Sequence, residues 1–257
     1  MRNKILNILT VICIVVLAVS GWKIGDFLYQ KYKSDKSGSE IKEVAKKSAA
    51  TSEPSEPGRW VPTKATFEDL HARNNDYVGW LLWDSDLISE PLLQGVSNNS
   101  YIRSNFDGQY DIWGSIFVDS NASLDADNIP IYGHSLTGVK SDHTKFSQLQ
   151  NMTDQGFCDA NSTFKIYWED HISSYKIFST MLIDTSADDW AYQQTAFGSD
   201  ESKLEWIKAA EDRSAISSDV KPTEHDKFVT FQTCHDDYSA VRYVIVAVQT
   251  GTEEYPN

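Results

Sequence analysis

The segment KFVTFQTCHDDYSAVRYVIVAVQ, residues 227–249, decides the fold. It contains two runs rich in Val, Ile, Phe and Tyr, at 227–233 and 241–249, with the mostly polar residues CHDDYSA between them. Runs of β-branched and aromatic residues that are bounded by polar turn residues are typical of β-strands. The segment therefore predicts two strands, with a cysteine directly after the first run.

Similar runs precede this segment. They are YVGWLLW at 77–83, SIFVD at 115–119, IPIYG at 129–133, TFKIYW at 163–168 and YKIFSTMLI at 175–183. Short strands separated by Gly, Asn, Asp and Ser predict a mainly antiparallel barrel or sandwich. Helices are fewer. One is expected over 199–213, where Ser199 suits the N-cap and acidic residues fill the first turn, and shorter ones over 66–74 and 143–150.

The first part of the chain is apolar. Residues 5–22, ILNILTVICIVVLAVSGW, carry no charge and follow Arg2 and Lys4. A helix of that length spans about 27 Å, close to the roughly 30 Å hydrocarbon core of a bilayer. We expect a single spanning helix with a cytoplasmic N-terminus. A cleaved signal peptide is the alternative, because Ala18-Val19-Ser20 resembles a cleavage site, and in both cases the rest of the chain is exported.

The sequence divides into three parts. Residues 1–22 are the membrane anchor or signal peptide, and residues 23–58 are a juxtamembrane polar tether. Within the tether, residues 34–58 have no aromatic side chain and too few branched apolar ones to fold alone, although some helical bias is expected around 39–50. The exported domain occupies residues 59–257.

Charge and cysteine content exclude several classes of function. The chain has a formal charge of −14, which repels phosphate backbones and argues against nucleic acid as a partner. Cys13, Cys158 and Cys234 allow at most one disulfide in the exported domain, between Cys158 and Cys234. Cys158 lies in the polar stretch DQGFCDAN, where we expect a loop with a free thiol. The histidines and cysteines lack zinc-ligand spacing, so we expect neither a metal nor a cofactor.

Three side chains form a candidate catalytic group. Cys234 follows the run FVTFQT, and its thiolate would need a partner that exchanges protons. His134 follows IPIYG, where Gly133 permits a tight turn. Arg242 lies in an apolar run, where burial of its charge is costly unless it faces a site or a carboxylate. Taken singly, each residue also has a structural explanation: a core or disulfide-bonded cysteine, a surface histidine, and an arginine whose head group extends to the strand edge.

The residues around these side chains resemble motifs of the sortase family. Thr230–Cys234, TFQTC, is similar to the sortase signature TLxTC, with Phe231 in place of leucine. Ile131–His134 resembles the segment that carries the family's catalytic histidine, and Arg242–Val244 resembles its arginine strand. The class B branch fits best, over roughly residues 67–249. Its further matching segments are Asp76–Trp80, Gln94-Gly95 with Asn98, Tyr101-Ile102, Gly114–Asp119 and the extra helix at 199–213.

This resemblance implies a mainly β fold, a closed β-barrel of about eight strands with an N-terminal helix pair and a long helix before the cysteine strand. It also implies a cysteine transpeptidase that works through a thioester acyl-enzyme. In that mechanism Cys234 attacks the peptide carbonyl, Arg242 stabilises the oxyanion, and His134 protonates the leaving amine.

The resemblance further implies partners and a location. The substrates are secreted proteins with an LPxTG-like or NPxTG-like sorting signal, which is cut after Thr. The acceptor is an amine of peptidoglycan or of a lipid-linked precursor, and the enzyme lies in a Gram-positive cell membrane with its catalytic domain outside. Asp236 is a candidate supporting acid, and Gln232 replaces a serine that is common in class B. Family position gives these candidate substrate contacts: Asn98, Ile102, Tyr132, Gln232 and Thr233.

Three other functions stay open. Pilin polymerisation is the alternative within the family, although the absence of an acidic-aromatic lid motif before residue 66 favours wall attachment. A catalytically silent, membrane-tethered binding module is an alternative of a different class. The third alternative is a structural exported domain in which Cys158 and Cys234 form a disulfide.

Overall fold

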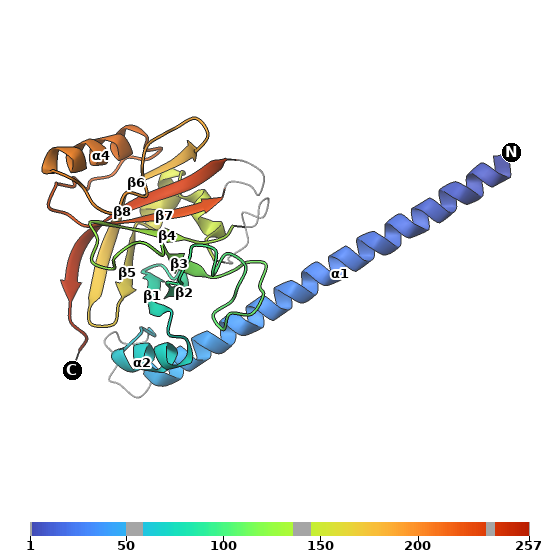
Figure 1. The fold of residues 1–257 in the computed structure, drawn as a ribbon, viewed down its shortest axis with the longest axis horizontal. Helices are drawn as coiled ribbons and strands as arrows, with labels where there is room; N and C mark the ends of the chain where they lie inside the picture. The colour runs from blue at the N-terminus through green and yellow to red at the C-terminus, as the bar shows by residue number, and fades with distance from the viewer. Residues whose placement is uncertain (1, 50–58, 136–144, 235–239, 257) are drawn as a thin grey trace.

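The computed structural model describes residues 2–49, 59–135, 145–234 and 240–256 of the chain. Eight strands form a closed barrel in the order β1-β2-β3-β4-β7-β8-β6-β5 (Figure 1). Its strands are β1 Tyr77–Trp83, β2 Ser89–Leu93, β3 Ile116–Val118, β4 Asn128–Tyr132, β5 Thr163–Tyr167, β6 Ile172–Asp184, β7 Phe228–Cys234 and β8 Val241–Glu253. The helices are α1 Arg2–Ala49, α2 Lys64–Arg73, the 3₁₀ helix η1 Ser147–Asn151, α3 Gln155–Ala160 and α4 Asp200–Asp212.

The barrel confirms the predicted fold class. Two pairings are parallel, β2 with β3 and β4 with β7, and the other described pairings are antiparallel. The seven predicted strands are all present, but β2 was missed. Its sequence SEPLL carries Glu90 and Pro91 in the middle, which breaks both the apolar run and the strand propensity.

Aromatic rings fill the interior of the barrel. Trp83, Phe164 and Phe231 are fully buried, and Phe164 lies 4.5 Å from Trp83 and 5.1 Å from Phe231 between ring centroids. Alternate residues of β7 and β8 face this interior, including Val229 opposite Ala247. Because side chains alternate along a strand, the intervening residues of both strands face outward.

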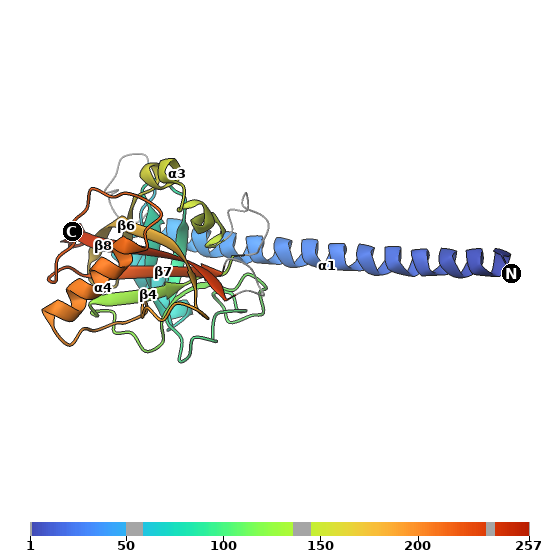
Figure 2. The ribbon, with the colours of Figure 1, turned by 90° about the horizontal axis from the view of Figure 1, so that it is seen from above.

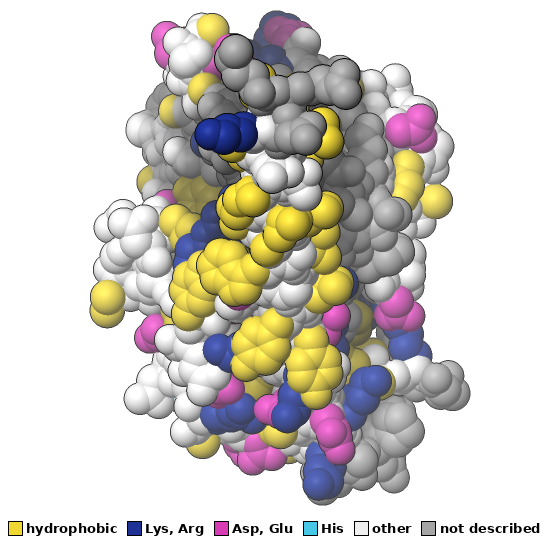
Figure 3. All heavy atoms as spheres, turned by 90° about the vertical axis from the view of Figure 1, so that its right-hand side faces the viewer, with side chains coloured by type: hydrophobic (Ala, Val, Ile, Leu, Met, Phe, Trp, Pro, Cys, Tyr) yellow, Lys and Arg dark blue, Asp and Glu magenta, His cyan; other side chains and the backbone are white. Residues whose placement is uncertain are grey.

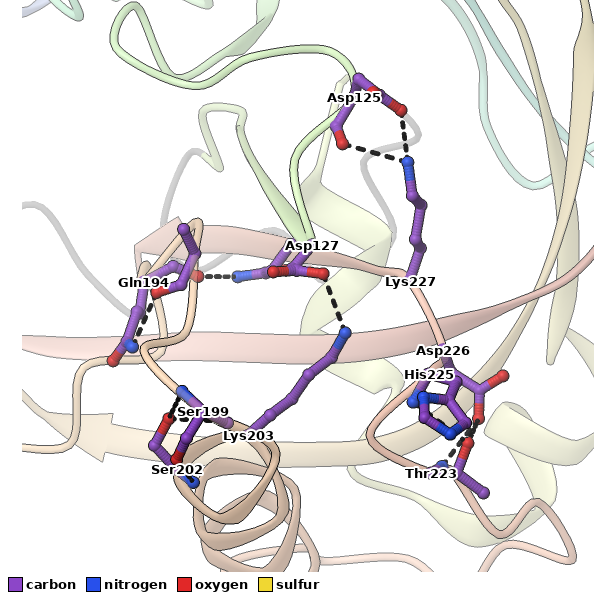
Figure 4. A network of polar contacts seen from close by, with 12 residues as sticks. Asp125, Asp127, Gln194, Ser199, Ser202, Lys203, Thr223, His225, Asp226 and Lys227 are labelled. Carbon is purple, nitrogen blue, oxygen red and sulfur yellow. Dashed lines mark hydrogen bonds and ion pairs between the residues drawn. The ribbon is translucent and has the colours of Figure 1, made fainter.

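Helix α4 covers part of that outer face. It begins after Ser199, whose side-chain oxygen accepts a hydrogen bond from the Ser202 backbone N–H, as predicted for the N-cap (Figure 4). Trp206 packs with Phe228 of β7 at a centroid distance of 5.3 Å. The ammonium of Lys203 lies 2.9 Å from the Asp127 carboxylate at the start of β4, which fixes the helix to the barrel (Figure 4).

Helix α1 is much longer than the predicted membrane span. It projects from the barrel as one continuous helix, with residues 4–29 exposed (Figures 1 and 2). It is apolar and long enough to cross a membrane. The face of the molecule that carries its free end shows hydrophobic side chains gathered at its centre, with Lys and Arg around them (Figure 3). Phe27 and Lys31 reach the buried Trp113 of the barrel, at 5.7 and 5.8 Å from its ring centroid.

The polar stretch that follows is helical as far as Ala49. Up to Ala49 it continues α1, and Ile41 and Ala45 are buried against α2, with Phe67 and Leu70 in the same apolar cluster. Ile41 and Ala45, one helical turn apart, are enough to dock this part of α1, because α2 and the barrel supply the rest of the buried surface. The predicted helix pair is confirmed, while the division of the chain into anchor, tether and catalytic domain stays a prediction.

Two local expectations need correction. Cys158 is not in a polar loop. It lies in α3, a short helix capped by Asp154, where its free thiol is buried in the barrel cluster. The cysteine is therefore not bonded to Cys234. The helix expected over 143–150 is replaced by the 3₁₀ helix η1, while residues 143 and 144 lie outside the described part of the chain.

A carboxylate that is largely shielded from solvent connects α1 to the barrel. Glu90 of β2 lies 2.9 Å from the ammonium of Lys42 in α1 and 2.9 Å from that of Lys145. Burial alone would raise the pKa of Glu90, but the two ammonium groups outweigh it and lower the pKa from 4.5 to about 2. A carboxylate whose pKa falls on folding stabilises the folded state above its unfolded pKa and loses this effect as the pH drops.

We therefore expect Glu90→Gln to lower the free energy of unfolding by about 3 kcal/mol at neutral pH. The difference from the wild type should shrink as the pH falls from 4.5 towards 2. Urea unfolding at neutral pH and at about pH 3 measures this. The control is Glu253→Gln, which breaks the more exposed pair with Lys165 and should cost less than about 1 kcal/mol. If the effect of Glu90→Gln on the free energy of unfolding does not change with pH, the lowered pKa of Glu90 is contradicted.

Candidate active site

A surface cavity of about 320 Å³ lies beside the carboxyl ends of β4 and β7. We call it the β4/β7 cavity. It collects all five candidate substrate contacts and His134, which come from three separate segments of the sequence. Its lining residues are Asn98, Ile102, Ser115, Phe117, Asp119, Tyr132, Gly133, His134, Gln193, Gln232 and Thr233. Apolar walls with a few amide, hydroxyl and carboxylate groups suit an extended peptide.

Strand pairing brings the three candidate catalytic residues to one end of the barrel. The parallel pairing of β4 with β7 sets Tyr132 beside Gln232, and the Gly133 N–H donates to the Gln232 carbonyl at 3.2 Å. The antiparallel pairing of β7 with β8 sets Cys234 directly opposite Arg242. His134 thus follows β4 at the level where Cys234 ends β7, on neighbouring strands.

The backbone of His134 is fixed from the following segment. Its carbonyl accepts a hydrogen bond from the Phe146 N–H at 3.2 Å. The Phe146 ring is fully buried and packs so closely on Gly133 that a Cβ there would lie 2.4 Å from the ring. Glycine is therefore required before the histidine for space. The half-buried imidazole of His134 lines the β4/β7 cavity.

Arg242 is also half-buried, and its Nη1 donates to the Val241 carbonyl at 2.9 Å. It is not among the described residues that line the β4/β7 cavity. The side chain of Cys234 and all of His235 and Asp236 lie outside the described part of the chain. The candidate role of Asp236 thus stays a prediction. In the described ranges, no group of three or more His, Cys, Asp or Glu is arranged to hold a metal ion.

Asp119 organises one wall of the cavity. Its Oδ2 accepts hydrogen bonds from Tyr132 Oη at 2.8 Å and from Asn98 Nδ2 at 2.9 Å. The Asn98 Oδ1 in turn accepts from the Ser120 N–H at 2.7 Å. Burial, together with the neighbouring Asp119 carboxylate, raises the pKa of Tyr132 far above its usual value, so the phenol stays protonated and donates. Asn98 and Tyr132 are thereby held rigidly at the cavity.

Gln232 is held from the segment between β6 and α4. Its Oε1 accepts hydrogen bonds from Tyr192 Oη at 2.6 Å and from Gln193 Nε2 at 3.0 Å. Beside it on β7, Thr233 is buried, and within the described residues its Oγ1 has no hydrogen-bond partner. The wall formed by Gln232 therefore depends on Tyr192 and Gln193.

Sequence reasoning missed Asp119, Tyr192 and Gln193. Asp119 closes the run SIFVD, and a carboxylate directly after a strand was the available signal. Tyr192 and Gln193 lie in AYQQTAF, which has neither apolar periodicity nor charge to mark it. Only the packing of that segment against β7 identifies them.

Comparison with known proteins gives a consistent result. No protein-family model matches the chain. Sortase B of Listeria monocytogenes is 31% identical over 242 residues, which cover 92% of this chain and 93% of the relative. The crystal structure of Clostridium perfringens sortase B superposes with a TM-score of 0.65 at 30% identity, covering 72% of this chain and 99% of that one. A Staphylococcus aureus sortase B-substrate complex shares the fold, with a TM-score of 0.70, 23% identity and coverage of 89% and 98%.

From the close contact between Gly133 and the Phe146 ring, we expect a side chain at position 133 to destabilise the fold. Gly133→Ala should lower the free energy of unfolding by about 1–3 kcal/mol, because the buried ring has no space to move into. Adding Phe146→Leu should recover part of the loss. The matched control is Gly198→Ala, where a Cβ meets nothing within 4 Å. Chemical denaturation of the variants provides the measurement, and equal stability of both alanine variants would refute the steric explanation.

Proposed function

The chain belongs to the sortase B family of cysteine transpeptidases, and we propose that it cleaves a C-terminal sorting signal after Thr and transfers the acyl group to a cell-wall peptidoglycan amine. The observation that carries this proposal is the strand register at the β4/β7 cavity. Cys234 and Arg242 are directly opposite each other, and His134 follows the strand on the other side of β7. Three chemically complementary residues thus share one end of the barrel.

In the proposed mechanism, Cys234 is the nucleophile. Its thiolate attacks the carbonyl carbon of the threonine, and the carbonyl oxygen takes up the negative charge. Arg242 is suited to stabilise this oxyanion, because its guanidinium does not titrate at physiological pH and offers several N–H donors in a fixed plane. Collapse of the tetrahedral intermediate then expels the amine of the following residue.

His134 is the proposed general acid and base. As an imidazolium it protonates the departing amine, which leaves a thioester between Cys234 and the threonine. The acceptor amine then attacks this thioester, the thiolate leaves, and neutral His134 accepts the proton from the attacking nitrogen. Fixing the His134 backbone through Phe146 limits the positions that the imidazole can take.

The β4/β7 cavity is the proposed binding site for the sorting signal. Asn98, Ile102, Tyr132, Gln232 and Thr233 all line it. The Staphylococcus aureus structure that shares this fold is a sortase B-substrate complex, which supports substrate binding by a protein of this fold. Gln232 presents an amide where class B sortases often carry serine, so we expect the preferred signal to differ between this chain and such relatives.

We propose that α1 anchors the enzyme in the cell membrane with the barrel outside. Residues 4–29 are exposed and largely apolar, and they point away from the barrel as one helix (Figure 1). The barrel begins to contact α1 at Phe27, about 8 Å along the helix axis from Trp22 at the end of the apolar run. This geometry would hold the barrel close to the outer membrane surface.

Cys234→Ala should abolish cleavage of a fluorogenic sorting-signal peptide, and Arg242→Lys should reduce kcat by about 100-fold, because lysine keeps the charge but loses the fork of donors. Cys158→Ala is the matched control. It removes the other cysteine of the exported domain, whose thiol is free and buried, and it should retain activity. Unchanged turnover in Cys234→Ala would refute the nucleophile assignment.

A panel of LPxTG-like and NPxTG-like peptides, read by mass spectrometry with a peptidoglycan-type amine or a pilin lysine peptide, identifies the signal and the acceptor. Transfer to the peptidoglycan-type amine is expected. Transfer only to the pilin lysine would establish the polymerising alternative, and binding without cleavage would establish the silent binding module.

A further inference from the structure

One buried carboxylate joins three segments that are distant in the sequence. The two oxygens of Glu90 on β2 divide between two cations: Oε1 lies 2.9 Å from Lys42 Nζ of α1, and Oε2 lies 2.9 Å from Lys145 Nζ. The side chains of Glu90 and Lys145 are only 14% and 13% exposed. A buried carboxylate with a different cation on each oxygen fixes the positions of both partners.

Lys145 directly precedes Phe146, the residue that fixes the backbone of the candidate catalytic His134. Its φ of 50° is in the left-handed region, which is strained for a non-glycine residue. The next residue, Phe146, donates its N–H to the His134 carbonyl and buries its ring on Gly133. Lys145 is paired with Glu90 through its side chain, and it directly precedes the residue that bonds the His134 carbonyl.

We infer that Glu90 is a positioning residue for His134, acting through Lys145 and Phe146, and that the docking of α1 through Lys42 supports it. This inference rests on the proposed function only in giving His134 the role of general acid and base. Neither Glu90 nor its two ion-pair partners, Lys42 and Lys145, is among the described residues that line the β4/β7 cavity. The effect of Glu90 on catalysis would therefore be indirect.

The contribution of α1 follows from the shared carboxylate. Lys42 is on the same helix as Ile41 and Ala45, which are buried against α2. The docked end of α1 therefore presents Lys42 to Glu90 from a fixed direction. Lys42 and Lys145 hold opposite oxygens, so losing either cation leaves Glu90 free to rotate towards the other. The juxtamembrane helix and the His134 segment are in this way linked through one side chain.

The experiment compares the full-length protein with Glu90→Gln, Lys145→Met, Lys145→Arg and Lys42→Met. The matched control is Asp127→Asn, which breaks the pair with the buried Lys203 at the opposite end of β4. Two quantities are measured at neutral pH: hydrogen exchange of the Phe146 amide without substrate, and kcat and KM for sorting-signal cleavage. Calorimetry of each variant establishes that it is folded.

We expect Glu90→Gln and Lys145→Met to increase Phe146 amide exchange by about tenfold, and to lower kcat by about tenfold while KM changes by less than about twofold. Lys42→Met should show smaller changes in the same direction. Lys145→Arg keeps the cation and should restore wild-type values. Asp127→Asn should change neither Phe146 exchange nor kcat, whatever its effect on the melting temperature.

Phe146 exchange that is unaffected by Glu90→Gln and Lys145→Met would overturn the inference, as would a faster exchange with unchanged kcat. An equal loss of kcat in Asp127→Asn would also overturn it, because general destabilisation would then explain the effect. Should Glu90→Gln fail to fold, Lys145→Met against Lys145→Arg makes the same comparison. Failure of the proposed function is distinguishable, because it would appear as a wild type without transpeptidation while the exchange measurements remain valid.

Discussion

The parallel pairing of β4 with β7 is the constraint on which the rest of the structure depends. It runs from Asn128 beside Phe228 to Tyr132 beside Gln232, and so joins segments about one hundred residues apart. Two parallel neighbours cannot be joined by a tight turn, so the chain must leave β4 and return at the start of β7. The intervening chain supplies η1, α3, β5, β6 and α4, which close the barrel and cover its outer face. Because both strands run in the same direction, their carboxyl ends lie together, and residues at both ends line one cavity.

The sequence predicted the elements that carry a strong local signal. Seven strands, the helix after Ser199 and the helix pair follow from runs of apolar residues, from an N-cap or from family motifs, and the closed barrel confirms them. The location of Asn98, Ile102, Tyr132, Gln232 and Thr233 around one cavity also agrees with their family positions, although their contacts with substrate stay a prediction. For the strands and helices, the sequence pattern itself determines which face of the element is buried or exposed.

The features that sequence reasoning missed all depend on tertiary partners. Strand β2 has Glu90 and Pro91 at its centre, and it is a strand only because β1 and β3 pair with it and two lysines neutralise the carboxylate. Residues 34–49 are polar and look unable to fold, yet they need only Ile41 and Ala45 to dock, since α2 provides the complementary surface. Cys158 lies among polar neighbours in the sequence, but its helix places it against the barrel core. Local composition cannot report a partner that is distant in the chain.

Ion pairs with at least one member largely shielded from solvent lie at both ends of β4, and their placement explains why the barrel tolerates them. Lys203 with Asp127 fixes α4 at the start of the strand, and Glu90 with Lys145 fixes the segment that follows its end. Replacing a buried ion pair with apolar side chains is often neutral or stabilising, so stability alone does not account for these pairs. Two apolar side chains can shift relative to each other and stay in contact. A carboxylate and a cation 2.9 Å apart keep their interaction only in a few relative positions. The aromatic core therefore provides most of the stability of the barrel, and the ion pairs determine where the segments flanking β4 lie, including the one that bears His134.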